Sequence, residues 1–165
     1  MTATLIVLSG LPGTGKTTVG RELARRLNAV FLRIDSIERP MIAAGWNVEG
    51  RGYEAAQAVA EDNLRLGNTV VADCVNPWPM TRAAWHAVAG RAGARAVDVE
   101  FVCSDTDAHR RRIEERRAAE PEAGWPAWQD VIDRDYRPWD TDRIVIDTGA
   151  LSPERAVETL LHSFR

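Results

Sequence analysis

The chain has 165 residues, of which 45% are hydrophobic and 27% are charged, and its formal net charge is −3. This length predicts one domain, residues 1–165, with a core large enough to fold without disulfide or metal staples. The acidic balance, with a pI near 5.7, argues against a generic nucleic-acid-binding protein, although a local basic site is compatible with it.

Apolar runs that end in glycine or in a polar residue predict buried strands, and apolar residues spaced three or four apart predict helices. In chain order, the first half predicts a strand at 4–9, a helix from Thr17, a strand at 29–35, an irregular segment at 36–51, a helix at about 53–66 and a strand at 68–74. The second half predicts a helix to about Gly90, a strand at 94–104, a charged helix at 105–119, an interruption at 120–128, a short helix to about Asp135, a strand at 142–148 and a last helix from Ser152 and Pro153. Strands that alternate with helices predict an α/β fold with a parallel sheet.

Two cysteines, Cys74 and Cys103, do not suggest a disulfide framework, which favours a reducing compartment. The apolar residues 4–9 lead into a glycine loop and lack the basic start and the cleavage site of a signal peptide. No stretch reaches the roughly 18 consecutive apolar residues of a membrane span. We therefore expect a cytoplasmic protein with no membrane partner.

The stretch GLPGTGKT, residues 10–17, is a complete G-x-x-x-x-G-K-[ST] motif between a predicted strand and a predicted helix. Its glycines let successive backbone N–H groups form a cradle for an anion, which the amino-terminal end of the helix reinforces. Lys16, the only lysine of the chain, can reach the β- and γ-phosphates, and Thr17 can offer its hydroxyl to Mg²⁺. The residues predicted to bind the nucleotide are Gly10, Leu11, Pro12, Gly13, Thr14, Gly15, Lys16, Thr17 and Thr18.

The loop alone does not define a reaction, because P-loop proteins include switches, motors and kinases. Guanine-specific switches usually carry an Asn-Lys-x-Asp signature, which a chain without a second lysine cannot contain. Motor ATPases are generally larger than this chain. A small kinase therefore fits the sequence best.

The chain resembles the small P-loop kinases that phosphorylate hydroxyl groups, and among them the group with polynucleotide 5′-kinase and chloramphenicol phosphotransferase. The resemblance rests on SGLPGTGKTT, on RIDS, on VVADCVNP and on an arginine-rich helix, in this order along the chain. It implies a P-loop NTPase three-layer sandwich with a five-stranded parallel sheet in the order 2-3-1-4-5. It also implies a helical lid at about 105–135.

In the resembled kinases an acidic residue at the end of the second strand lies near the acceptor hydroxyl, and Asp35 matches it. A carboxylate at the carboxyl end of a strand also faces the crevice where open α/β sheets bind ligands, so Asp35 could accept the hydroxyl proton or orient the hydroxyl. The alternative is that Asp35 caps a helical turn. Arg39, four residues on, is predicted to bind an anionic part of the acceptor, with an ordinary surface position as the alternative.

Asp73 ends the apolar stretch VVAD, which has the form of a Walker B segment. We expect Asp73 to organise Mg²⁺ together with Thr17. The resemblance also places Asp73 and Asn76 near the acceptor, as an Asp-x-x-Asn element. A turn-capping aspartate and an ordinary Asn-Pro turn are the alternatives.

The stretch HRRRIEERR, residues 109–117, contains five arginines in the implied lid. In the resembled kinases such a lid closes over the phosphates and donates arginines to the transferred group, which can raise the rate by about 10³-fold. Arg112 and Arg116 share one helical face and match the spaced pair of the family, so both are predicted to be catalytic, as are Lys16 and Asp35. The alternative is a solvated face on which the arginines pair with neighbouring glutamates.

Other candidates carry weaker signals. Packing is favoured for the tryptophans of the irregular segments, with Trp46 and Trp78 as candidates for stacking on a planar substrate. Thr148 and Gly149 follow the last predicted strand, where related kinases place the adenine. His109 has no Cys or His partner at a metal-ligand spacing, so the sequence assigns it no role.

The sequence thus predicts an ATP- and Mg²⁺-dependent phosphotransferase that moves the γ-phosphoryl group to a hydroxyl of a small molecule, such as a sugar, a nucleoside or an antibiotic. Two alternatives stay open. One is a 5′-hydroxyl polynucleotide kinase, which the acidic pI disfavours, and the other is an ATP-binding regulatory module that transfers nothing. The acceptor, the preference for ATP over other nucleotides and the oligomeric state are left open by the sequence.

Overall fold

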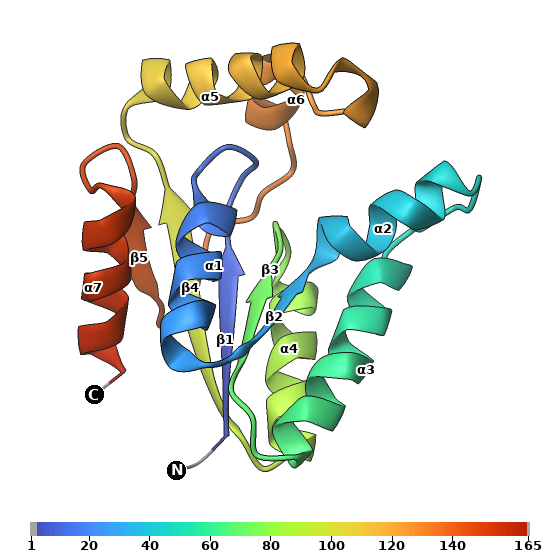
Figure 1. Ribbon diagram of the computed structural model, residues 1–165, viewed down its shortest axis with the longest axis vertical. Coiled ribbons are helices and arrows are strands. Elements are labelled where there is room, and N and C mark those ends of the chain that lie inside the picture. The colour runs from blue at the N-terminus through green and yellow to red at the C-terminus, as the bar shows by residue number, and fades with distance from the viewer. Residues whose placement is uncertain (1–2, 165) are drawn as a thin grey trace.

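The structure, a computed structural model, describes residues 3–164, which form one sheet of five parallel strands (Figure 1). The strands lie in the order β2-β3-β1-β4-β5. Their bounds are Thr4–Ser9 for β1, Val30–Arg33 for β2, Val70–Asp73 for β3, Arg95–Val102 for β4 and Ile144–Asp147 for β5. This order confirms the α/β P-loop fold and the 2-3-1-4-5 sheet predicted from the sequence.

Helices cover both faces of the sheet, with α3 and α4 on one face and α1 and α7 on the other. The bounds are Lys16–Leu27 for α1, Ile34–Ala43 for α2, Arg51–Arg65 for α3, Pro79–Arg91 for α4, Thr106–Ala119 for α5, Pro121–Ala123 for the 3-10 helix η1, Trp128–Ile132 for α6 and Pro153–Ser163 for α7. None of the helices in the described part of the chain combines the length and the apolar character needed to cross a membrane.

The central strand, β1, is buried on both sides, and its alternating side chains divide the core into two clusters. Leu5 and Val7 pack with residues of α3 and α4, whereas Ile6 and Leu8 pack with residues of α1 and α7. This alternation follows from the two-residue repeat of a strand, and each fully buried aliphatic side chain contributes about 1.5–3 kcal/mol. The core therefore fixes β1 at the centre of the sheet, and the glycine loop that follows it lies at the carboxyl edge.

The segment after β2 differs from the sequence-based expectation. The sequence predicts an irregular segment at 36–51, but α2 begins at Ile34 and continues through Pro40 to Ala43. A proline inside a helix removes one backbone hydrogen bond, and α2 tolerates this loss while it projects from the body (Figure 1). Asp35 therefore lies in the first turn of α2 and not at the end of a strand.

The two tryptophans singled out by the sequence lie at the surface. Trp46 follows the projecting end of α2 and is 64% exposed, so it does not pack in the core. Trp78 precedes α4, and its Nε1 donates a 3.0 Å hydrogen bond to Asp135 Oδ2 in the segment after α6. Stacking of either ring on a substrate stays a prediction.

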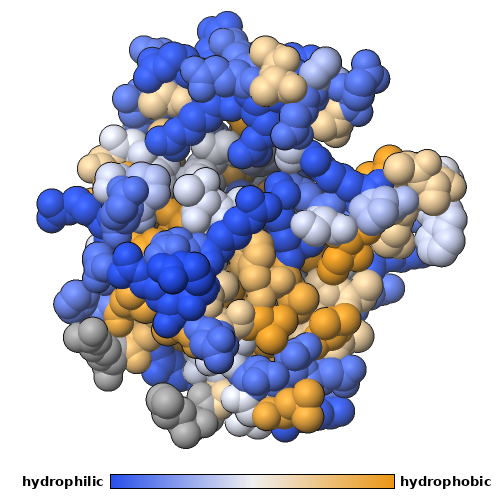
Figure 2. Space-filling view, in the orientation of Figure 1, coloured by the Kyte–Doolittle hydropathy of each residue, from blue (hydrophilic) through white to orange (hydrophobic). Residues whose placement is uncertain are grey.

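Helices α5 and α6, with η1 between them, lie across the carboxyl ends of the strands like a lid (Figure 1). We call these three elements the lid. Figure 2 shows a recess between the lid and the body, with hydrophilic residues on both sides of it. The carboxyl ends of the strands and the glycine loop therefore lie beneath a polar cover.

Arg82 on α4 anchors the chain segment that returns from the lid to the sheet. Its guanidinium is buried and lies over the ring of Trp139, 4.0 Å from the centroid. It donates hydrogen bonds of 2.6–3.2 Å to four backbone carbonyls, those of Asn76, Pro77, Arg137 and Pro138. This single side chain therefore joins the loop after β3 to the base of the lid.

Replacing Arg82 with alanine should lower the free energy of unfolding by about 3 kcal/mol, because four carbonyls lose a charged donor and Trp139 loses its packing. Urea denaturation measures the change. Arg95→Ala, at an exposed position of β4, should stay within about 0.5 kcal/mol of the wild type. Equal stability of the two variants would contradict the anchoring role.

Candidate functional site

The glycine loop lies between β1 and α1 and beneath the lid (Figure 1). Gly13 has a φ of +80°, and a Cβ there would lie 2.6 Å from Ile113 Cδ1 of the lid. Gly10 has a φ of +141°, and a Cβ there would lie 2.3 Å from the carbonyl oxygen of Phe101 in β4. Glycine is therefore required at both positions, because the chain adopts a positive φ and approaches its neighbours closely.

Lys16 begins α1, and its residue is only 8% exposed. Its Nζ donates hydrogen bonds to the carbonyl oxygens of Gly10 at 2.7 Å and of Leu11 at 2.9 Å. Burial lowers the pKa of the Lys16 ammonium, and the negative charge of Asp73 opposes this shift. The loop thus encloses the ammonium group that the motif is expected to place beside a polyphosphate.

Thr17 and Asp73 meet at the carboxyl edge of the sheet, where β3 lies beside β1. The Thr17 hydroxyl donates a 2.6 Å hydrogen bond to Asp73 Oδ2, and Asp73 is buried. Hydroxyl and carboxylate oxygens are the ligands that Mg²⁺ prefers, and Mg²⁺ that is also bound by phosphates needs only one or two carboxylates. The pair therefore fits the predicted magnesium role, although the described residues contain no group of three or more His, Cys, Asp or Glu side chains that could hold a metal ion.

Arg33, the last residue of β2, links the two carboxylates of the site. Its Nη2 lies 2.9 Å from Asp35 Oδ2, and its Nε lies 3.7 Å from Asp73 Oδ2. The Asp35 side chain is 47% exposed, so it is accessible to a ligand. Arg33 is not among the site residues predicted from the sequence, although its place at the end of a strand, two residues before a candidate acid, is a usable signal.

Asn76 is buried and adopts a φ of 50° immediately before Pro77. Its Nδ2 donates to Ser9 Oγ at 3.0 Å, and its backbone N–H donates to the hydroxyl of Tyr53 at 2.9 Å. The Asn-Pro turn is thus present, and the side chain ties the end of β1 to the loop after β3. The Asn76 Oδ1 atom is buried without a hydrogen-bond partner, and contact between Asn76 and a substrate stays a prediction.

The two lid arginines predicted to be catalytic reach different parts of the site. Arg112 donates to Thr148 Oγ1 at 2.9 Å and to the Thr148 carbonyl at 3.0 Å, and Thr148 Oγ1 donates to the carbonyl of Thr14. Arg116 lies over the ring of Trp125, 4.7 Å from the centroid, and burial lowers its pKa. Arg112 is thus engaged with the segment after β5, where the adenine is expected, and Arg116 contacts a different part of the lid.

His109 connects the lid to the glycine loop, although the sequence assigns it no role. Its Nε2 lies 2.7 Å from the carbonyl oxygen of Pro12, so this nitrogen carries a proton and donates it. The ring packs edge-on against Trp128, with the centroids 5.0 Å apart. Burial of the imidazole lowers the pKa of His109 below its usual value of 6.5.

Acidification should destabilise the protein through His109. Because the folded state favours the neutral imidazole, the unfolded chain binds the proton more readily, and the free energy of unfolding should fall as the pH drops below the usual histidine pKa of 6.5. His109→Gln keeps an N–H donor for Pro12 but does not titrate, so urea denaturation should show a flatter profile over this range. His162→Gln, at an exposed position of α7, should keep the wild-type slope, and an equal slope in His109→Gln would contradict the assignment.

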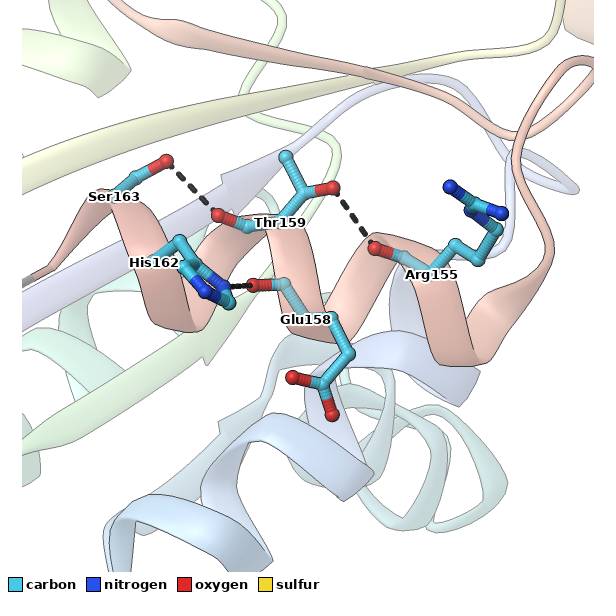
Figure 3. A pocket seen from close by; sticks show the side chains of 5 residues that line it. All are labelled: Arg155, Glu158, Thr159, His162 and Ser163. Atoms are coloured by element: carbon cyan, nitrogen blue, oxygen red, sulfur yellow. Dashed lines mark hydrogen bonds between the residues drawn. The ribbon is translucent and has the colours of Figure 1, made fainter.

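A shallow depression lies on the exposed face of α7 (Figure 3). It is lined by Arg155, Glu158, Thr159, His162 and Ser163. All five residues are exposed, and three of their side chains hydrogen-bond to carbonyls of their own helix. This is an open helix face, and its charged side chains are exposed, unlike the buried Lys16 and Asp73 beneath the lid.

Fold and site together define a P-loop nucleotide-binding protein. The chain belongs to a family described as an AAA domain (AAA_33), whose family model matches residues 5–134. Among curated proteins, none matches the chain significantly. The narrower resemblance to polynucleotide 5′-kinase and chloramphenicol phosphotransferase stays a prediction.

Several solved structures of other proteins share the fold. APS kinase of Mycobacterium tuberculosis, in complex with AMPPNP and APS, is 20% identical with a TM-score of 0.77, over 98% of this chain and 97% of that one. A gluconokinase from Sinorhizobium meliloti 1021 is 16% identical with a TM-score of 0.63, over 99% and 96%. Kti12 of Chaetomium thermophilum, in complex with ADP-AlF3, is 18% identical with a TM-score of 0.66, over 98% and 99%. At these identities the likeness shows the fold alone.

Proposed function

We propose that the protein is an ATP- and Mg²⁺-dependent phosphotransferase that moves the γ-phosphoryl group to a hydroxyl of a small molecule. The observation that carries the proposal is a second carboxylate beside the nucleotide motif. Asp35 is joined through Arg33 to Asp73, which contacts the loop through Thr17. A site that only binds a nucleotide has no need of an exposed acid in this position, whereas transfer to a hydroxyl does.

In the proposed reaction, the acceptor oxygen attacks the γ-phosphorus, the bond to the β–γ bridging oxygen breaks, and ADP leaves. The loop amides and Lys16 hold the β- and γ-phosphates and stabilise the charge that develops on the bridging oxygen. Asp35 accepts the proton of the hydroxyl, or orients it. Thr17 and Asp73 would hold Mg²⁺, which supplies further positive charge to the phosphates when bound. Arg116 neutralises the transferred group.

The remaining predicted residues take supporting roles in this proposal. Arg112 orders the segment after β5 through Thr148, beside the expected position of the adenine. Asn76 shapes the acceptor side together with Arg39. The whole chain acts as one kinase domain, and the region at about 105–135 closes over the bound substrates.

A panel of sugars, nucleosides, antibiotics and a 5′-hydroxyl oligonucleotide, incubated with ATP and Mg²⁺ and analysed by mass spectrometry, tests the proposal. The expected result is the gain of one phosphoryl group on a small hydroxyl compound, which Asp35→Asn strongly reduces. Transfer to the oligonucleotide alone would favour a polynucleotide kinase. Release of ADP that no hydroxyl compound stimulates would favour a regulatory module and contradict the proposal.

A further inference from the structure

Three arginines from separate elements converge on the indole ring of Trp125, which lies in the segment between η1 and α6. The guanidinium carbons of Arg39 in α2, Arg116 in α5 and Arg33 in β2 lie 3.7, 4.7 and 6.0 Å from the ring centroid. Trp125 is itself held by its Nε1, which donates a 3.0 Å hydrogen bond to Glu120 Oε2. This ring therefore brings the lid into contact with β2 and α2 at the place where these elements join.

The carboxylates near this cluster pair with two of its three arginines. Asp35 and Asp73 lie 2.9 and 3.7 Å from Arg33, and Glu120, which is more than half exposed, lies 3.9 Å from Arg39. In the described part of the chain, no carboxylate lies within ion-pair distance of Arg116. Burial and the positive charge of Arg33 both lower the pKa of Arg116. The cluster thus holds three guanidinium groups close together, and among the described residues that of Arg116 has no ion-pair partner.

Two guanidinium nitrogens of the cluster, Arg33 Nε and Arg39 Nη2, are buried and have no hydrogen-bond partner. Arg33 Nε lies 3.7 Å from an Asp73 oxygen, which is too long for a hydrogen bond. Buried charged donors are costly when they lack an acceptor, so native structures usually provide one. Two such donors in one cluster indicate a ligand with acceptor oxygens.

Arg39 lies farther from the sheet than Asp35 does, because it is nearer the outer end of α2. The two residues are four positions apart on α2, so they share a face and are separated by about 6 Å along the axis. Because α2 leads away from the edge of the sheet (Figure 1), Arg39 lies one turn farther out than Asp35. Nucleotide phosphates in the loop already have Lys16 and the loop amides, so an anion at Arg39 belongs to the acceptor.

We propose that the phosphoryl acceptor carries an anionic group, a carboxylate, phosphate or sulfate, which Arg39 and Arg33 bind beneath Trp125. The acceptor hydroxyl then lies about one helical turn away, at Asp35. This inference rests on the proposed function and adds the substrate class to it. The acceptor is a small hydroxy acid or a hydroxyl-bearing ester of phosphate or sulfate, and neutral sugars and nucleosides are poor substrates.

A binding experiment on the full chain tests the inference before the acceptor is known. The loop is first filled with AMPPNP and Mg²⁺, and the Tm is then followed against added sulfate at constant ionic strength. Sulfate should stabilise the wild type, and Arg39→Gln should need about tenfold more sulfate for the same shift. Arg39→Lys, which keeps the charge, should need a sulfate concentration between those of the wild type and Arg39→Gln. Arg155→Gln, at an exposed position of α7, should show the same sulfate dependence of the Tm as the wild type.

Equal sulfate dependence in Arg39→Gln and the wild type would overturn the inference, as would the absence of any sulfate effect on the wild type. Failure of AMPPNP to raise the Tm before sulfate is added would instead contradict the proposed function, so the two failures are distinguishable. Matched acceptors, such as gluconate with glucose and glycerate with glycerol, give a second readout. Phosphoryl transfer to glucose in preference to gluconate, or to glycerol in preference to glycerate, would also overturn the inference.

Discussion

Lys16→Ala should reduce kcat/KM for phosphoryl transfer by about 10³-fold or more, because it removes the ammonium that stabilises the β- and γ-phosphates as the bond between them breaks. The loop holds this group in place before any ligand binds, through the carbonyls of Gly10 and Leu11. No other lysine exists in the chain to replace it. Steady-state formation of ADP with an acceptor from the panel measures the loss.

Lys16→Arg is the matched control for charge. It keeps the positive charge but replaces a compact ammonium with a wider planar group, so it should recover only part of the activity. Circular dichroism should show that both variants are folded, because the sheet does not depend on this side chain. A Lys16→Ala variant that keeps more than about a tenth of the wild-type kcat/KM would remove Lys16 from the mechanism.

Asp35→Asn should lower kcat by about 10²- to 10⁴-fold while the Kd for AMPPNP stays within about twofold. The amide keeps the size of the side chain but cannot accept the proton of the acceptor hydroxyl. Nucleotide binding is expected to persist, because its predicted contacts come from residues 10–18 and not from α2. Rapid-quench measurements of transfer and calorimetry with AMPPNP determine the two quantities separately.

Asp62→Asn, at an exposed position of α3, controls for the loss of one negative charge and should leave both quantities unchanged. Unchanged kcat in Asp35→Asn would remove this residue from the mechanism. A parallel loss of AMPPNP binding in Asp35→Asn would show that the carboxylate acts on the nucleotide and not on the acceptor.

The centre of the fold follows from local sequence patterns. The apolar residues of the run at 4–9 are buried because β1 packs between two helical layers. The motif at 10–17 needs glycine at positions 10, 13 and 15, where the backbone φ is positive, so its loop conformation can be predicted from the residues themselves. Asp73 could be placed at the end of β3 for a similar reason, since all four residues of this strand are buried. These features depend on neighbours in the sequence, so the sequence predicts them well.

The surroundings of the second carboxylate depend on tertiary packing and could not be predicted in the same way. Pro40 and the nearby glycines favour an irregular segment at 36–51, but α2 packs against α3, and this packing outweighs the local cost of the proline. Asp35 accordingly belongs to a helix. It still lies at the carboxyl edge of the sheet, because α2 begins directly after β2.

Contacts between side chains and residues far away in the sequence could not be predicted from one sequence. Arg82 binds carbonyls more than 50 positions later in the chain, and no local pattern distinguishes it from the other arginines. Arg33, Arg39 and Arg116 meet Trp125 from three elements that only the fold brings together. The sequence predicts Arg39 and Arg116 as site residues, but it does not predict that both contact Trp125.

A crystal structure with AMPPNP and Mg²⁺ tests the central claim most directly. The triphosphate chain should lie in the loop at 10–17, with Lys16 beside the β- and γ-phosphates and the Asp35 carboxylate facing the γ-phosphoryl group across the recess. A loop without the nucleotide, or an Asp35 side chain turned away from the γ-phosphoryl group, would contradict the claim.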